Sequence, residues 1–144
     1  MSHIKTLLLF LILVSSQALA KQNNIYDPTR IAIDDYYNAL ATATVKHQNI
    51  FVIAGGNWCK WCYKFEKDLH KLGYDKTIKS KFVFMKANWS EENENEGFFN
   101  LFPKIKAFPH IMIISNHGKL LESRPVNFSE KEFVAILNKY SDAT

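Results

Sequence analysis

The sequence predicts an α/β fold whose helices and strands follow one another in the order α-β-α-β-α-β-β-α. Two patterns carry this prediction. Short runs at residues 50–54 and 110–114, apolar except for His110, have the length of buried strands. Residues 63–72 and 129–140 instead place apolar side chains at helical spacing. With 144 residues, of which 47% are apolar and 14% aromatic, the chain is long enough for one domain with a substantial core.

The first twenty residues are typical of a secretory signal peptide. Lys5 precedes an apolar stretch at residues 6–14, and Ala18-Leu19-Ala20 has the small-x-small pattern of a cleavage site before Lys21. The apolar stretch is shorter than the roughly 20 residues that span a bilayer, which favours cleavage over an uncleaved membrane anchor. We therefore expect an exported protein, periplasmic in a Gram-negative bacterium, without stable membrane insertion after cleavage.

After the cleavage site, residues 21–28 are polar, and we expect them to form a flexible lead to the domain of residues 29–144. Asp27 and Pro28 are residue types favoured at the N-cap and the first position of a helix, which we expect to extend to about Lys46. The positions of this helix expected to face the core are Ile33, Tyr36, Tyr37, Leu40 and either Ala41 or Ala43.

The only two cysteines of the chain come directly after the first strand. Gly55-Gly56-Asn57 ends the strand, Cys59 and Cys62 follow, and a helix is predicted over residues 63–72, with Gly73 as its C-cap. This order places Cys59 at a strand-to-helix junction, beside free backbone N–H groups and the positive end of the helix dipole. Both features favour the thiolate, which is the form of cysteine that attacks disulfides. As a structural staple the pair would contribute little, because a bridge over two intervening residues closes a very short loop.

The second half of the chain supplies the remaining elements. Ser90 is expected to cap a helix that begins in the acidic run 88–96 and ends before Pro103. A last helix is expected to begin at Ser129, which forms a capping box with Glu132. The other expected elements are a helical turn at residues 75–80 and strands at residues 81–87, 110–114 and 119–124.

Three segments, taken together, are similar to a known family. They are Trp58-Cys59-Lys60-Trp61-Cys62 between a strand and a helix, Ala107-Phe108-Pro109-His110 at the start of a later strand, and the turn Asn116-His117-Gly118-Lys119. A Cys-x-x-Cys pair alone is a weak signal, because zinc sites also use it, but the three segments in this order are specific. Over roughly residues 29–140 the chain resembles the thioredoxin superfamily. The resemblance implies a thioredoxin-like three-layer sandwich, with a mixed four-stranded sheet flanked by helices.

The resemblance also implies a role for several residues. Cys59 would be the nucleophile and Cys62 the resolving thiol, and the two would form a redox-active disulfide. Trp58, Phe108 and Pro109 would bind the substrate. In the family, a cis-proline strand holds the substrate chain as an added strand through the backbone just before the proline, which implies a cis bond between Phe108 and Pro109.

Two departures from thioredoxin itself concern the surroundings of the cysteines. Trp61 stands where thioredoxin has proline, and because the dipeptide Lys60-Trp61 tunes the redox potential, the direction of electron flow stays open. Thioredoxin also has a buried aspartate six residues before its first cysteine, where this chain has Ile53. Ile53 cannot accept a proton, and Glu66 is the nearest acidic residue in sequence.

Composition and spacing argue against several other classes of site. The net charge of +4 and pI near 9.0 come from scattered lysines, which predicts solubility and not nucleic-acid binding. Haem attachment requires histidine where the chain has Tyr63. The histidines lack zinc-like spacing, and the acidic run 88–96 lacks the ligand spacing of a calcium loop. We therefore expect no cofactor and no metal, and we interpret His110 as a strand residue beside the site.

The sequence thus predicts an exported thiol–disulfide oxidoreductase. Its expected partners are protein thiols and disulfides together with an unidentified redox partner, and a monomer is expected. One alternative is a reductant dedicated to a single pathway, such as cytochrome c maturation. The other is a binding module that keeps the thioredoxin fold without catalysis, against which the intact pair Cys59 and Cys62 argues.

Overall fold

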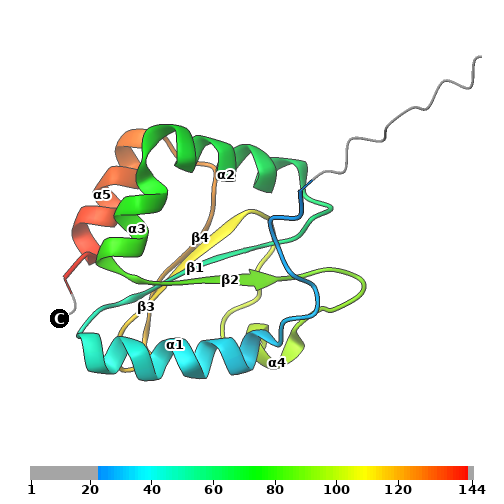
Figure 1. The fold of residues 1–144 in the computed structure, drawn as a ribbon, viewed down its shortest axis with the longest axis horizontal. Helices are drawn as coiled ribbons and strands as arrows, with labels where there is room; N and C mark the ends of the chain where they lie inside the picture. The colour runs from blue at the N-terminus through cyan, green and yellow to red at the C-terminus, as the bar shows by residue number, and fades with distance from the viewer. Residues whose placement is uncertain (1–22, 143–144) are drawn as a thin grey trace, which may run out of the picture.

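The computed structural model describes residues 23–142, which form five helices and four strands (Figure 1). The expected signal peptide, residues 1–20, lies outside the described residues. The helices are α1 (Ala32–Lys46), α2 (Lys60–Leu72), α3 (Tyr74–Lys81), α4 (Glu96–Phe99) and α5 (Glu130–Tyr140). The strands are β1 (Ile50–Gly55), β2 (Val83–Asn88), β3 (His110–Ile114) and β4 (Leu120–Pro125). Within residues 23–142, no helix is both long enough and apolar enough to cross a membrane.

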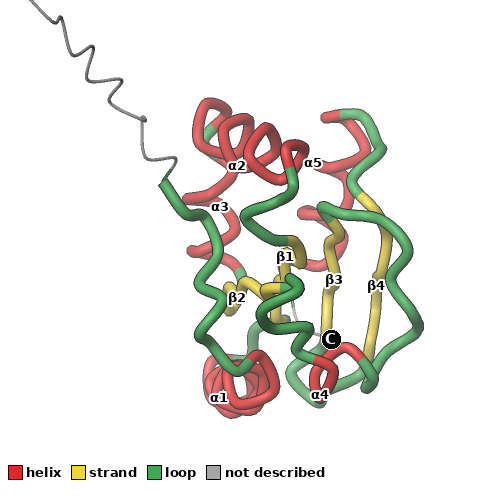
Figure 2. The backbone as a smooth tube through the Cα atoms, turned by 90° about the vertical axis from the view of Figure 1, so that its right-hand side faces the viewer, coloured by secondary structure: helices red, strands yellow, loops and turns green. Residues whose placement is uncertain are grey.

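The four strands form one mixed sheet in the order β2-β1-β3-β4. β1 pairs with β2 in parallel and with β3 antiparallel, and β3 pairs with β4 antiparallel. Helices α1 and α4 cover one face of the sheet, and α2, α3 and α5 cover the other (Figures 1 and 2). This arrangement confirms the predicted three-layer sandwich.

β1 lies at the centre of the molecule and is buried along its whole length. Because side chains alternate between the faces of a strand, Ile50, Val52 and Ala54 enter the core beneath α1 and α4, whereas Phe51 and Ile53 enter the opposite core. This double burial explains why the strand is a continuous apolar run, with no polar residue at alternate positions. The turn that follows β1 is therefore anchored at the end of a fully buried strand.

The expected ends of two helices are confirmed. Gly73 ends α2 in the left-handed conformation, with φ of 75°, which favours glycine because it has no Cβ. At the start of α5, the Ser129 side chain accepts a hydrogen bond from the Glu132 amide, and the Glu132 carboxylate accepts one from the Ser129 amide. These residues interact within a few positions of one another, so local sequence is sufficient to predict them.

The predicted start of the first helix is wrong by four residues. α1 begins at Ala32, and the Asp27 carboxylate instead accepts hydrogen bonds from the amide and hydroxyl of Thr29, at 2.9 and 2.6 Å. The amide of Ala32 donates at 2.8 Å to the side-chain oxygen of Asn95, which lies 63 positions away in the sequence. Of the two tyrosines expected to face the core, Tyr36 is buried whereas Tyr37 is 57% exposed.

The predicted helix cap at Ser90 is also wrong. Ser90 is buried in a loop, where its hydroxyl accepts a hydrogen bond from the Asn88 side chain, and α4 begins only at Glu96. The Asn93 side chain donates to the carbonyl oxygens of Pro28 and Arg30, at 2.9 and 3.0 Å. The run interpreted as a solvated helix start therefore ties the β2–α4 loop to the segment before α1.

Candidate functional site

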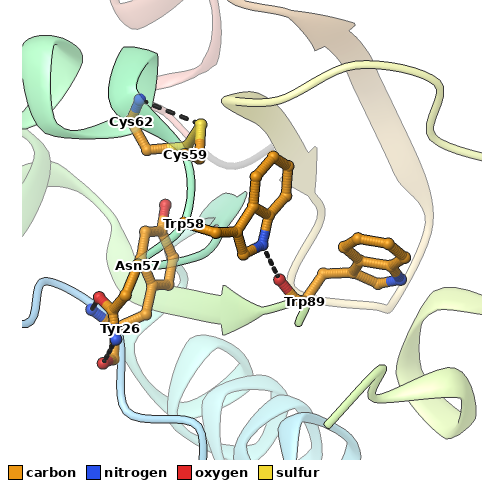
Figure 3. The surroundings of a disulfide bond; sticks show 6 residues. All are labelled: Tyr26, Asn57, Trp58, Cys59, Cys62 and Trp89. Atoms are coloured by element: carbon orange, nitrogen blue, oxygen red, sulfur yellow. Dashed lines mark hydrogen bonds between the residues drawn. A yellow bond between two sulfur atoms is a disulfide. The ribbon is translucent and has the colours of Figure 1, made fainter. Parts of the chain in front are cut away.

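The two cysteines lie where β1 passes into α2, as the sequence predicts. The amide of Cys59 donates to the carbonyl of Gly56 at 3.1 Å, which closes a tight turn after the strand. Cys59 is the N-cap of α2, and its Sγ accepts a hydrogen bond from the amide of Cys62 at 3.2 Å (Figure 3). A thiolate at Cys59 is stabilised here by an amide N–H and by the positive end of the helix dipole.

Cys59 and Cys62 form a disulfide, with Cα atoms 5.2 Å apart. Both residues are buried, and they pack with Tyr26 and with the partly buried Ile25 and Phe108 in a small cluster of their own. The disulfide is therefore enclosed by side chains from the N-terminal segment and from the loop before β3, which are distant from it in sequence.

An aromatic trio, Trp58, Trp89 and Phe108, lies beside the disulfide. Each pair of rings in the trio has centroids 5.6 to 5.8 Å apart, and Trp89 is stacked on Phe108. The indole N–H of Trp58 donates to the carbonyl of Trp89 at 2.7 Å, which fixes the ring although the residue is 56% exposed (Figure 3). A Cβ at Gly56 would overlap both the Trp58 indole and the Trp89 carbonyl, so this close approach requires glycine. The trio forms an apolar surface next to the disulfide, with Trp58 exposed and Trp89 and Phe108 partly buried.

Residues 21–28 were expected to form a flexible lead, but in the described part of this segment Ile25 and Tyr26 are held in place by hydrogen bonds. The segment Ile25-Tyr26, which we call the strap, is held by the side chain of Asn57. The Asn57 side-chain oxygen accepts from the amides of Ile25 and Tyr26, at 3.0 and 2.9 Å, and its nitrogen donates to the Tyr26 carbonyl at 2.8 Å (Figure 3). The strap is thus attached to the same turn that carries the cysteines.

The loop before β3 closes the site from the other side. The Phe108–Pro109 peptide bond is cis, and the carbonyl of Pro109 accepts a hydrogen bond from the Val126 amide at 2.8 Å. Within residues 23–142, neither the N–H nor the C=O of Phe108 makes a hydrogen bond to another backbone group. His110 follows at the start of β3, where its Nε2 lies 2.9 Å from the Ser123 hydroxyl, and burial lowers the pKa of its ring.

A groove of about 590 Å³ extends from this loop along α2. Its walls come from α2, from the loop before β3 and from the connection between β4 and α5. Trp61, which is 65% exposed, stands at the groove beside Phe108 and Pro109. The lining is mainly apolar, with Phe65, Leu69, Val126, Phe128 and Phe133 among its residues.

The family model described as thioredoxin-like matches residues 31–115, which is more than half of the chain. The chain belongs to the thioredoxin-like family. No curated protein sequence matches it.

Solved structures share the thioredoxin-like fold at low sequence identity. The disulphide isomerase from Xylella fastidiosa Temecula1 superposes with a TM-score of 0.70 at 19% identity, over 83% of this chain and 98% of its own. The DsbH oxidoreductase superposes with a TM-score of 0.58 at 17% identity, over 90% of this chain and 92% of its own. A thioredoxin-fold protein from Helicobacter pylori has a TM-score of 0.55 at 21% identity, over 69% of this chain and 75% of its own.

In this thioredoxin-like domain, a charged pair lies close to the position of Ile53. Ile53 is buried and is the register partner of Lys86 on β2. The Lys86 ammonium lies 2.8 Å from the Glu66 carboxylate and donates to the carbonyl of Ile25 at 3.1 Å. Glu66, the nearest acidic residue to the cysteines in sequence, is therefore an ion-pair partner of Lys86, and its side chain is 22% exposed.

Three residues of the thioredoxin-like site escaped sequence analysis: Tyr26, Asn57 and Trp89. Tyr26 has one apolar neighbour, Ile25, in an otherwise polar segment, and Trp89 precedes an acidic run, so neither lies in an apolar pattern that predicts burial. The only signal was the presence of a large aromatic residue in each otherwise polar stretch. No cluster of three or more potential metal-binding His, Cys, Asp or Glu side chains occurs in the part of the chain that the structure describes.

Proposed function

We propose that this chain is an exported thiol–disulfide oxidoreductase that exchanges disulfides with protein substrates. Cys59 is the attacking thiol and Cys62 the resolving thiol. The observation that carries this proposal is the position of Cys59 at the N-cap of α2, where its sulfur accepts the amide N–H of Cys62 at 3.2 Å. A hydrogen bond and a helix N-terminus both stabilise a thiolate, so the first sulfur is the better nucleophile at neutral pH.

The reaction runs in two exchanges. The Cys59 thiolate attacks one sulfur of a substrate disulfide, the substrate S–S bond breaks, and the other substrate sulfur leaves as a thiolate. The Cys62 thiolate then attacks the sulfur of Cys59 and expels the second substrate thiolate. Two electrons pass from the protein to the substrate, and the Cys59–Cys62 disulfide remains. The reverse sequence oxidises a substrate dithiol.

The substrate chain docks beside the disulfide on Trp58, Phe108 and Pro109. The exposed indole of Trp58 and the backbone of Phe108, which makes no backbone hydrogen bond within residues 23–142, support this assignment. An extended peptide pairs its own backbone with such a free edge, while its side chains enter adjoining pockets. The apolar groove that begins at Phe108 and Pro109 offers such a pocket.

Export is supported by the apolar stretch at residues 6–14 and by the small residues of Ala18-Leu19-Ala20. The mature protein then begins near Lys21 and acts in the periplasm. Intact-mass measurement of protein recovered from the exporting cell tests this part of the proposal. A mass that retains residues 1–20 contradicts it.

The nucleophile assignment is tested by trapping partners as mixed disulfides. Cys62→Ser lacks the resolving thiol, so it is expected to accumulate Cys59-linked complexes that reducing agent releases. Cys59→Ser is expected to trap far fewer, and the variant lacking both cysteines serves as the matched control. Equal trapping by the two single variants, or trapping by neither, contradicts the proposed roles and favours a binding module.

The redox potential of the Cys59–Cys62 couple determines the direction of electron flow. Equilibration of the mature protein with glutathione buffers, followed by alkylation and mass measurement, yields this potential. A value near the thioredoxin end of the family, about −270 mV, indicates a reductant, and a value near about −120 mV indicates an oxidant.

A further inference from the structure

The strap brings a phenol to the buried side of the disulfide. Tyr26 is 4% exposed and packs directly on Cys59 and Cys62. Its backbone cannot shift freely, because both its amide and its carbonyl are bonded to the side chain of Asn57. The ring is therefore held against the cysteines by the turn that precedes them (Figure 3).

The hydroxyl group of Tyr26 points toward the disulfide (Figure 3). A Cβ placed on Gly55 would lie 2.7 Å from the Tyr26 hydroxyl oxygen and 2.6 Å from the Sγ of Cys62. Both atoms thus border the same small space, which exists because residue 55 has no side chain. The hydroxyl lies on the side of Cys62, whereas Cys59 already has the amide of Cys62 as its donor.

The surroundings keep this phenol in its protonated form. Burial raises the pKa of Tyr26, and the negative charge of Glu66 raises it further, so the group is a hydrogen-bond donor throughout the neutral range. Glu66 from α2 is paired with Lys86 from β2, and the Lys86 ammonium lies 5.4 Å from the centre of the Tyr26 ring. Asp27, Arg30 and Asp35, together with Lys86, are the charged residues that line a pocket with Ile25 and Tyr26.

We propose that, in the reduced protein, the Tyr26 hydroxyl donates a hydrogen bond to the sulfur of Cys62 and stabilises the thiolate that breaks the mixed disulfide. This inference rests on the proposed function for its biological meaning. Cys62 loses its proton to water, its thiolate attacks the sulfur of Cys59, the bond from Cys59 to the substrate breaks, and the substrate thiolate leaves. Tyr26 keeps its own proton throughout and acts as a positioning residue.

The direct test measures the ionisation of Cys62 alone. In a Cys59→Ser background, Cys62 is the only thiol, and its thiolate is followed by ultraviolet absorbance as the pH is raised. Adding Tyr26→Phe keeps the ring but removes the hydroxyl, so we expect about tenfold less thiolate at a given pH below the midpoint, as for the loss of a hydrogen bond to a charged group. Tyr37→Phe, an exposed tyrosine on α1, is the matched control and should leave the curve unchanged.

A second measurement follows the resolving step in the chain with both cysteines. Reduced protein mixed with excess 5,5′-dithiobis(2-nitrobenzoate) releases one chromophore when Cys59 attacks and a second when Cys62 resolves. Tyr26→Phe is expected to slow the second phase about tenfold at neutral pH, with the difference vanishing in alkali, where Cys62 is ionised in both proteins. The first phase should be unchanged.

Several outcomes overturn the proposal. The proposal is wrong if the Cys62 titration curves with and without the Tyr26 hydroxyl superimpose, or if Cys62 is more acidic in Tyr26→Phe. Circular dichroism must show that the variant is folded. Asn57→Ala frees the strap without altering Tyr26, and we expect it to shift the titration in the same direction; an unshifted curve in this folded variant also counts against the proposal. A shifted titration without exchange on any protein disulfide supports the hydrogen bond but contradicts the proposed function.

Discussion

Replacing Asn57 by alanine removes every hydrogen bond that holds the strap to the active-site turn. The wild-type side chain makes three of them, two to the amides of Ile25 and Tyr26 and one to the Tyr26 carbonyl. A typical intramolecular hydrogen bond contributes about 1 kcal/mol, and an unsatisfied buried group costs more. The partial burial of these groups lets water replace some of the lost partners, so we expect Asn57→Ala to lower the free energy of unfolding by about 2–4 kcal/mol.

The assay is urea unfolding of the oxidised mature protein, followed by far-ultraviolet circular dichroism. Asn138→Ala is the matched control, because Asn138 is exposed on α5 and its replacement removes an asparagine without touching the strap. We expect the control to stay within about 0.5 kcal/mol of wild type, as is usual for surface substitutions. If Asn57→Ala also stays within this range, the strap does not contribute to stability and the reasoning is refuted.

Three further predictions follow from the packing around the site. Gly55→Ala places a methyl group 2.6 Å from the sulfur of Cys62, and we expect urea unfolding to show a loss of about 1–3 kcal/mol from overpacking; an unchanged midpoint contradicts the close approach. Ile53→Asp buries a carboxylate beside the register partner Lys86, so it should lower the free energy of unfolding by about 2–5 kcal/mol. The new carboxylate can accept the proton of Cys62, so resolution of the mixed disulfide should become faster at neutral pH in single-turnover kinetics. No gain in rate means that another group already accepts the proton. His110 has a pKa below the unfolded value of about 6.5, so its neutral ring stabilises the fold above that pH and this contribution is lost as the pH falls through the lower folded pKa. Urea midpoints should therefore drop more between pH 7 and 5 for wild type than for His110→Gln, and parallel drops contradict the assignment.

Local patterns were sufficient to predict the sheet and the helix ends that depend on near neighbours. β1 and β3 were evident as apolar runs because strands buried on both faces carry no polar alternation. Ser129 and Glu132 interact within one helical turn, and Gly73 adopts a conformation that few other residues tolerate. In each case, the residues that determine the structure lie within a few positions of one another.

The two wrongly predicted helix starts, at Asp27 and Ser90, concern regions where side chains bond to backbone groups far away in sequence. The Asn95 side chain, 63 positions away, accepts the hydrogen bond of the first amide of α1, so Asp27 is not the N-cap that its local sequence predicts. Asn93 bonds to carbonyls 63 and 65 positions away, and this held Ser90 in a loop where a helix was expected. Asparagine offers both a donor and an acceptor, and no sequence pattern indicates which distant backbone group it will meet.

The sequence by itself determined that Cys59 and Cys62 lie between a central strand and a helix, because apolar periodicity, glycine and cysteine spacing are local properties. Only the tertiary structure decided what surrounds the two sulfurs. Tyr26 reaches Cys62 because Asn57 binds its backbone across 31 positions, and Trp89 meets Trp58 because β2 and β1 end side by side. Such contacts depend on the order of strands in the sheet. This order brings together segments that are distant in the chain, and the local sequence of each segment does not predict which other segment it will contact.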